Sequence, residues 1–193
     1  MPLRPRAARF GRSLVLLAAP LLLAPHPLTA QSAPANPPGN AAREAVAKVA
    51  FLEGSWKGEA SIDMGPRGTQ SIVQTETVES RLGGAALVVH GLGKSRAVEG
   101  QPERVVHEAI GVIYHDEATK GLKILAIKAD GASTTSDLVP EAGGWRWFLS
   151  TPRGRVRYTI SQPNPGEWHE VGEISPDGAT WRKFYEMRLQ KER

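Results

Sequence analysis

Cysteine is missing from this 193-residue chain. Its absence excludes disulfide bonds, a thiolate nucleophile and cysteine ligands for a metal ion. A domain folded from this chain therefore depends on its hydrophobic core alone, which favours one well-closed domain. Two enzyme signatures are missing as well. No serine lies in a nucleophile elbow, and Gly91-Leu92-Gly93 lacks the third glycine and the following helix of a dinucleotide-binding loop.

The excess of positive charge is confined to the first 30 residues. They hold four of the 24 Lys and Arg residues and none of the 20 Asp and Glu residues, so 20 basic and 20 acidic residues remain beyond them. The basic isoelectric point of the whole chain, about 9.6, thus gives no argument for binding nucleic acid or an anionic membrane. We expect no nucleic-acid partner.

The same residues have the composition of a secretory signal peptide. Arginines within residues 1–12 precede a short apolar run, Leu14–Leu23, and small residues follow. The pattern predicts a signal peptide over residues 1–30, cleaved after Ala30 or, alternatively, after Ala33. The apolar run is shorter than the roughly 20 residues that span a membrane, and an uncleaved anchor is the competing interpretation. We expect a periplasmic or secreted protein with no membrane span after cleavage.

A linker and one helix are predicted next. Residues 31–39 are rich in Pro, Ala and Ser and have no apolar period, which indicates a flexible linker. Asn40 can cap a helix that ends near Gly54. The apolar residues at helical spacing within it are Ala42, Val46, Val49, Ala50 and Leu52.

From Trp56 onward the apolar period changes to two, as in half-buried strands. The predicted strands are 56–64, 70–79, 84–93, 106–115, 121–129, 132–138, 144–149, 154–161, 167–174 and 179–189. Because no helix long enough for a crossover separates them, they predict an all-β domain over residues 40–191. Its expected architecture is an antiparallel up-and-down β-barrel of about ten strands with one short N-terminal helix. The polar stretch Lys94–Arg104 is predicted to be a mobile lid over an open barrel end.

Several short segments resemble those of known barrels. The segments are Phe51–Trp56, Leu82-Gly83-Gly84, Gly111–Asp116, Ser175–Gly178 and the last strand, Trp181–Leu189. Together they resemble lipocalin-like bacterial barrels known only as a domain of unknown function, within the calycin-type group that also includes the haem-binding nitrobindins. The resemblance implies a barrel with a cavity and implies no activity.

The resemblance also implies two expectations about individual side chains. In calycin-type barrels an arginine of the last strand covers the opening tryptophan, so Arg182 or Arg188 is expected over Trp56. Nitrobindin-like haem binding uses an axial histidine in the C-terminal part of the barrel, where this chain offers only His169. Because the last strand has no histidine, and the four histidines beyond the signal peptide have no metal-ligand spacing, we predict no cofactor and no metal.

Aromatic side chains are concentrated in the C-terminal half. Trp145, Trp147 and Trp168 lie on strand faces that are predicted to point inward, and Tyr185 shares a face of the last strand with Trp181. They are interpreted either as a packed core or as the wall of a cavity for a small apolar or ring-bearing ligand.

Three charged residues fall on the same apparently inward faces. Lys183 lies on the same strand face as Trp181, Glu170 on the same face as Trp168, and Glu108 on the same face as Val106. Because a buried charge needs a partner, Lys183 with Glu170 or Glu108 is predicted to form a polar spot that orients a ligand. The alternative is a β-bulge that reverses a strand and places these residues in water.

These features predict an exported, non-catalytic carrier or sensor for a small, largely apolar ligand. The predicted ligand-binding residues are Trp145, Trp147, Trp168, Tyr185, Lys183 and Glu170. One alternative is a filled barrel that acts as a protein-interaction module. Another is an enzyme that uses Glu170 or Glu108 as an acid–base group, which requires an inward carboxyl with a raised pKa beside a cavity.

Overall fold

The computed structural model describes residues 39–97 and 102–193. The predicted signal peptide over residues 1–30 and nearly all of the predicted linker lie outside the described residues. None of the helices in the described ranges is long and apolar enough to cross a membrane.

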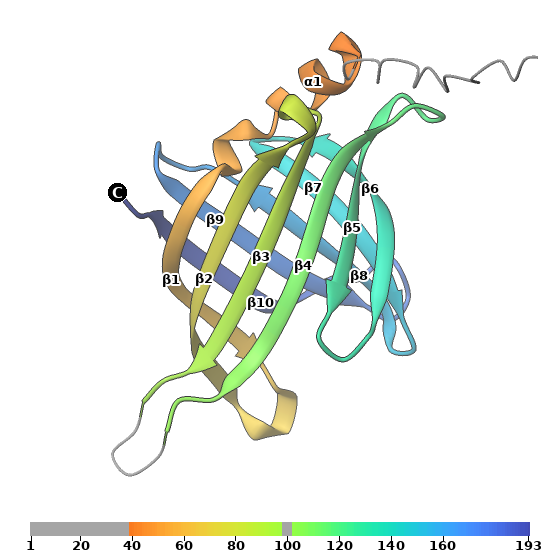
Figure 1. The fold of residues 1–193 in the computed structure, drawn as a ribbon. Coiled ribbons are helices and arrows are strands. Elements are labelled where there is room, and N and C mark those ends of the chain that lie inside the picture. Colours follow the sequence, from red (N-terminus) through yellow and green to blue (C-terminus); the bar gives the residue numbers. More distant parts are fainter. Residues whose placement is uncertain (1–38, 98–101) are drawn as a thin grey trace, which may run out of the picture. The chain divides into compact units, whose positions relative to one another are not determined.

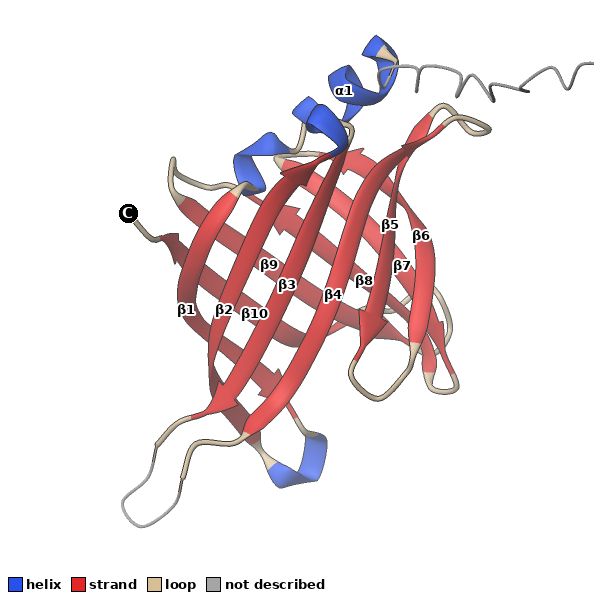
Figure 2. Cartoon of the chain, in the orientation of Figure 1, coloured by secondary structure: helices blue, strands red, loops and turns tan. Residues whose placement is uncertain are grey.

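Ten antiparallel strands form a closed barrel in which each strand pairs with its neighbours in the chain and the last pairs with the first (Figures 1 and 2). The strands are β1 (Gly54–Asp63), β2 (Thr69–Arg81), β3 (Ala86–Ser95), β4 (Val105–Asp116), β5 (Gly121–Lys128), β6 (Ser133–Glu141), β7 (Gly144–Thr151), β8 (Gly154–Ser161), β9 (Glu167–Ser175) and β10 (Arg182–Lys191). The predicted all-β, up-and-down barrel is confirmed, and most predicted strand ends lie within two residues of the observed ones.

Alternation of side chains builds the barrel wall. On β1 the side chains of Trp56 and Ala60 are buried while those of Lys57 and Glu59 are exposed. Two-residue turns join β6 to β7 and β7 to β8, and Gly143, in the first of them, has a φ of 77°. That value lies in the left-handed region, where a side chain would be strained, so glycine suits this turn.

The N-terminal elements pack on one end of the barrel. Helix α1 (Asn40–Ala47) contacts β3, β4 and β5, and a 3₁₀ turn, η1 (Ala50–Leu52), leads into β1 (Figure 1). Val46, Val49 and Leu52, three of the five residues of the predicted apolar stripe, are at most 2% exposed. The α-helix ends at Ala47, before the predicted end near Gly54. The predicted cap is wrong: the Asn40 side-chain oxygen accepts a hydrogen bond from Arg43 at 2.8 Å instead of binding a backbone N–H.

Trp56 forms the floor beneath these elements. It is fully buried, donates a 2.7 Å hydrogen bond to the Leu52 carbonyl, and meets Trp168 edge-on at 5.8 Å between ring centroids. The predicted arginine cover is wrong. Because the β1–β10 register places Lys191 opposite Trp56, the Lys191 ammonium lies 5.3 Å from the centre of the ring.

Arg182 and Arg188, the two residues expected over Trp56, both make ion pairs with other partners. Arg182 pairs with Asp63, and Arg188 pairs with Glu167 and Glu186. Their side chains are more than half exposed.

The predicted lid, Lys94–Arg104, is only partly described, because residues 98–101 lie outside the described ranges. Its first residues, Lys94 and Ser95, belong to β3, and the Ser95 N–H donates to the Arg104 carbonyl at 2.9 Å. Within the described part, the segment therefore continues the β3–β4 ladder.

Candidate functional site

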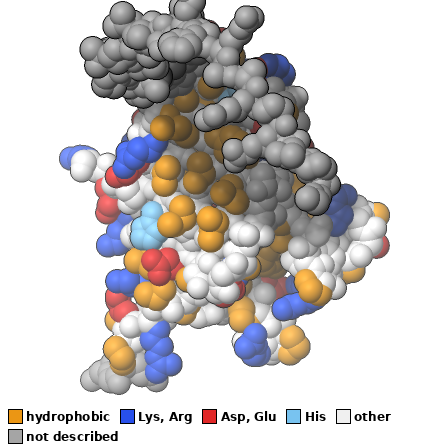
Figure 3. Space-filling view, turned by 45° about the vertical axis from the view of Figure 1, so that its right-hand side comes forward, with side chains coloured by type: hydrophobic (Ala, Val, Ile, Leu, Met, Phe, Trp, Pro, Cys, Tyr) orange, Lys and Arg blue, Asp and Glu red, His pale blue; other side chains and the backbone are white. Residues whose placement is uncertain are grey.

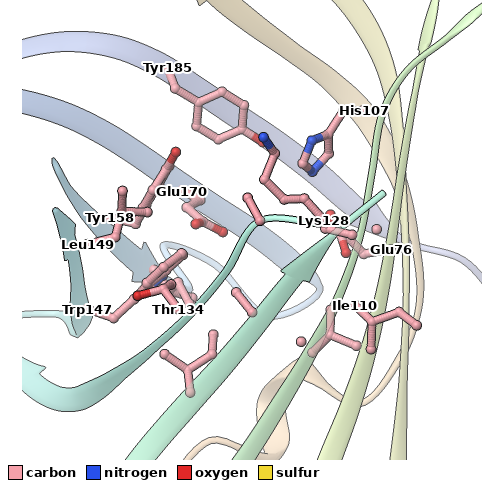
Figure 4. A pocket seen from close by; sticks show the side chains of 18 of the residues that line it. Glu76, His107, Ile110, Lys128, Thr134, Trp147, Leu149, Tyr158, Glu170 and Tyr185 are labelled. Carbon is pink, nitrogen blue, oxygen red and sulfur yellow. The ribbon is translucent and has the colours of Figure 1, made fainter. Parts of the chain in front are cut away.

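A cavity of about 610 Å³ occupies the barrel interior (Figure 4). Side chains from all ten strands line it, and Leu52 from η1 lies at the plugged end. Small residues on the inner faces leave the space open: β4 contributes Ala109 and Gly111, and β5 contributes Ala126. The interior is therefore not filled by its own side chains.

The cavity reaches the surface where β6 and β7 separate. These strands pair at only three positions, from Val139 opposite Arg146 to Glu141 opposite Gly144. Beyond them, the Phe148 N–H donates to the Ser136 hydroxyl at 3.0 Å in place of a backbone ladder. Residues on both sides of this separation line the cavity, and several are exposed: Ala132, Ser133, Ser150 and Pro152.

Aromatic rings form one wall of the cavity. Trp147 stacks on Tyr158 with centroids 4.7 Å apart, and Tyr185 meets Tyr158 edge-on at 5.9 Å. Trp147, Trp168 and Tyr185 line the cavity, whereas Trp145 packs against the hydrophobic core and does not. Tyr158 was not among the predicted site residues, although the alternation of Arg155 and Arg157 with apolar neighbours on β8 places it inward.

Two carboxyl groups lie within this apolar cavity. Glu170 comes from β9 and Glu76 from β2, strands that β1 and β10 separate in the barrel (Figure 4). Burial raises the pKa of Glu76 from 4.5 to about 7, although a hydrogen bond from the Gln74 amide, at 2.8 Å, opposes this shift. Burial also raises the pKa of Glu170 to about 8, and the Glu76 charge adds to that increase. The two acids are therefore coupled, because ionisation of one disfavours ionisation of the other.

The surroundings of Glu170 supply hydrogen-bond donors without a positive charge. The indole N–H groups of Trp147 and Trp168 have no partner at hydrogen-bond geometry, and these side chains are 8% and 3% exposed. Both donors are near enough to the Glu170 carboxyl to lower its pKa, in opposition to burial. They are placed to donate to the carboxylate once it forms.

Glycines make room for these groups. A Cβ added at Gly91 would lie 2.7 Å from both carboxyl oxygens of Glu76. A Cβ at Gly172 would lie 2.8 Å from the Tyr158 ring and 2.9 Å from the Tyr185 side chain. The Glu76 carboxyl and the tyrosine rings therefore lie directly against bare strand backbone.

Two basic residues line the cavity, but neither neutralises the acids. The Lys128 ammonium pairs with Asp130 at 2.7 Å. Burial and the charge of Lys128 both lower the pKa of His107, which keeps its imidazole neutral near pH 7. Within residues 39–97 and 102–193, no cationic nitrogen lies within ion-pair distance of Glu76 or Glu170.

The inward placement predicted for Lys183 is wrong. A β-bulge between Lys183 and Tyr185 reverses the order of side chains on β10. Lys183 is consequently outside, 57% exposed, and pairs with Glu186 at 2.5 Å, whereas Phe184 and Tyr185 line the cavity. Trp181 lies outside as well, beneath the Arg157 guanidinium at 4.2 Å.

The inward placement predicted for Glu108 is also wrong. Glu108 does share a face with Val106, but there that face points to solvent, and Glu108 contacts His90 at 3.2 Å. Exposed apolar side chains gather on this outer surface (Figure 3). The inner face of β4 carries small residues where it borders the open cavity, so the more apolar face of this strand is the outer one. This is why the alternation of apolar residues on β4 predicted the wrong face.

No known family identifies the chain. No protein-family model matches it, and no curated protein matches its sequence. The part of the chain that the structure describes contains no group of three His, Asp or Glu residues arranged to hold a metal. His169, the one C-terminal histidine considered for haem, lies on the outer face of β9 and contacts Glu186 at 3.0 Å.

Proposed function

We propose that this protein binds a small, largely apolar ligand inside its barrel and acts as a carrier or sensor. The observation that carries the proposal is the cavity of about 610 Å³, with an aromatic wall and few polar groups. Ligand sites of ordinary size, roughly 300–1,000 Å³, have this composition. The open interior counts against the alternative of a filled interaction module.

We further propose that the barrel belongs to the calycin-type group and is exported. The ten-stranded closed architecture is compatible with that group, and the short sequence segments described above support the assignment. Export rests on the composition of residues 1–30 alone. N-terminal sequencing of protein recovered from the periplasm or medium is expected to begin at Gln31, or at Pro34 for the alternative cleavage; a chain that still begins at Met1 would contradict cleavage.

A second function has one observation in its favour. The pKa of Glu170, raised to about 8, gives a protonated carboxyl beside the cavity at neutral pH, as a general acid requires. Glu108 does not meet this condition, because it faces solvent. Turnover of a bound compound that Glu170→Gln abolishes without reducing affinity would favour the enzyme over the carrier.

The binding proposal is tested with N-phenyl-1-naphthylamine, a neutral apolar fluorophore. Wild-type protein comprising residues 31–193 is expected to bind it with enhanced fluorescence. Ala109→Trp places an indole in the cavity and is expected to abolish binding, whereas Val106→Trp places the same group on the outer face of the same strand and is expected to have no effect. Equal binding by all three proteins, or no binding by wild type, would overturn the proposal.

A further inference from the structure

The acid pair in the cavity is a feature that an apolar ligand alone does not explain. An apolar ligand needs no carboxyl groups, and burying an ionisable group without a partner is unfavourable. Gln74 and Glu76 are both under 9% exposed, and Glu170 is half-buried on the cavity wall. The cavity therefore contains two carboxyl groups, those of Glu76 and Glu170, whose burial is unfavourable. No cation of the described residues forms an ion pair with either of them.

The surroundings of the acids favour a cation of a particular kind. The indole N–H groups of Trp147 and Trp168 have no other partner and are placed to donate to the Glu170 carboxylate without neutralising its charge. The aromatic wall of Trp147, Tyr158 and Tyr185 offers ring faces and edges beside the same carboxyl. Carboxylates together with aromatic faces bind ammonium groups, through charge and through cation–π attraction.

A hydrated metal ion fits this site poorly. The lining is mainly apolar, and of the residues that the structure describes only two, from separate strands, place a carboxyl group in the space. Hard metal ions prefer six or more oxygen ligands, while a quaternary or protonated amine on an apolar body needs only charge compensation and apolar contact.

We propose that the ligand is an organic cation: an ammonium group on an apolar or aromatic body, held between Glu170, Glu76 and the aromatic wall. This inference rests on the proposed function and names the chemical class of its ligand. Lys128 and His107 line the same side of the cavity as Glu76 (Figure 4), but Lys128 pairs with Asp130 and His107 is neutral near pH 7, so neither forms an ion pair with the acids.

Binding of such a ligand is coupled to proton release. Without ligand, Glu170 keeps its proton near neutral pH and Glu76 is partly protonated, since burial raises their pKa values to about 8 and about 7; a bound ammonium group favours ionisation of both. The affinity therefore rises with pH until the acids are ionised in the free protein. The other titratable groups that line the cavity with the acids are Tyr158 from β8, Tyr185 from β10, His107 from β4 and Lys128 from β5. His90, on the outer face of β3, acts on Glu76 only through its charge, which lowers the pKa of Glu76. Both tyrosines have raised pKa values, and so stay neutral in this pH range.

A matched pair of probes tests the inference. (2-Naphthylmethyl)trimethylammonium and 2-neopentylnaphthalene have the same shape and differ in one atom, a charged nitrogen in place of a carbon. Each displaces N-phenyl-1-naphthylamine from the wild-type protein if the cavity accepts it. The affinity of the cation is expected to rise about tenfold per pH unit from about pH 6 until the acids ionise, and that of the neutral probe to stay constant.

The variants separate the acids from the cavity. At about pH 9, Glu170→Gln and Glu76→Gln are each expected to lower the affinity for the cation by about tenfold or more, equivalent to about 1.4 kcal/mol. Neither substitution is expected to change the affinity for the neutral probe. Glu108→Gln removes a carboxyl from the outer surface and is the matched control. Calorimetry of the wild type near pH 7, in buffers of different ionisation enthalpy, is expected to show release of about one proton with the cation only.

The two proposals fail in different ways. If the neutral probe binds but the cation does not, or if the cation binds without pH dependence and without a response to either glutamine variant, the organic-cation inference is overturned and the apolar cavity stands. If neither probe displaces the fluorophore, or the fluorophore itself does not bind, the proposed function is overturned as well.

Discussion

Replacing Glu170 with glutamine should stabilise the protein, and only above acidic pH. Below pH 4.5 the carboxyl is protonated in both the folded and the unfolded chain, so its effect on the free energy of unfolding does not change. As the pH rises toward about 8, the unfolded chain loses this proton while the folded barrel keeps it. The folded state therefore loses stability relative to the unfolded state over this range.

The magnitude follows from the pKa values. Each pKa unit corresponds to about 1.4 kcal/mol, so raising the pKa from 4.5 to about 8 costs up to about 5 kcal/mol above pH 8 and about 3 kcal/mol at pH 7. Glutamine has a similar shape and no such cost. We expect Glu170→Gln to match the wild type at about pH 4 and to gain close to those amounts at higher pH.

Urea denaturation followed by tryptophan fluorescence measures the difference. The lowered pKa of His107 also makes the stability depend on pH, because it makes the free energy of unfolding rise with pH. This contribution is the same in both proteins, so it cancels when the variant is compared with the wild type at each pH. Glu108→Gln, on the outer surface, is expected to show no such pH-dependent gain. A gain for Glu170→Gln that is the same at low and high pH, or no gain at all, would show that this carboxyl is not buried as described.

Three further substitutions test the barrel itself, each by urea denaturation. Ser136→Ala removes the acceptor of the Phe148 N–H where β6 and β7 separate, and is expected to cost about 1 kcal/mol and to speed exchange of the Phe148 amide. Gly58→Ala places a Cβ 2.0 Å from the Arg188 carbonyl oxygen, and is expected to cost about 3 kcal/mol or more at the β1–β10 closure. Trp56→Phe leaves a buried carbonyl without its donor and is expected to cost about 1–3 kcal/mol.

Matched substitutions control these effects. Ser133→Ala, at an exposed position of β6, is expected to change stability little. Gly121→Ala meets no atom closer than 3.8 Å and is expected to be tolerated. If either control were as destabilising as its partner, the specific contact would not be the cause.

The fold could be predicted from the sequence because its signals are local. Apolar alternation with a period of two, interrupted by glycine-rich turns, marks the ends of the strands. The parity of β9 follows from the same pattern, which is why Trp168 and Glu170 were predicted inward together and both line the cavity.

The rest of the site depends on features that alternation does not record. A β-bulge at Lys183 reverses β10, and nothing in the local sequence marks its position. On β4 the inner face is the less apolar one, because it borders an open cavity. Glu76 was missed because both faces of β2 carry apolar residues, Val73 on one and Ile72 on the other, so the local pattern does not decide which points inward.

Native mass spectrometry of protein purified from an exporting host tests the central claim most directly. The account predicts a non-covalent adduct on the wild-type chain that is lost on denaturation and is missing from Ala109→Trp protein prepared in the same way. The adduct mass should be that of a small molecule bearing an amine or quaternary ammonium group. A bare mass for both proteins, or the same adduct on both, would contradict a ligand held in the barrel cavity.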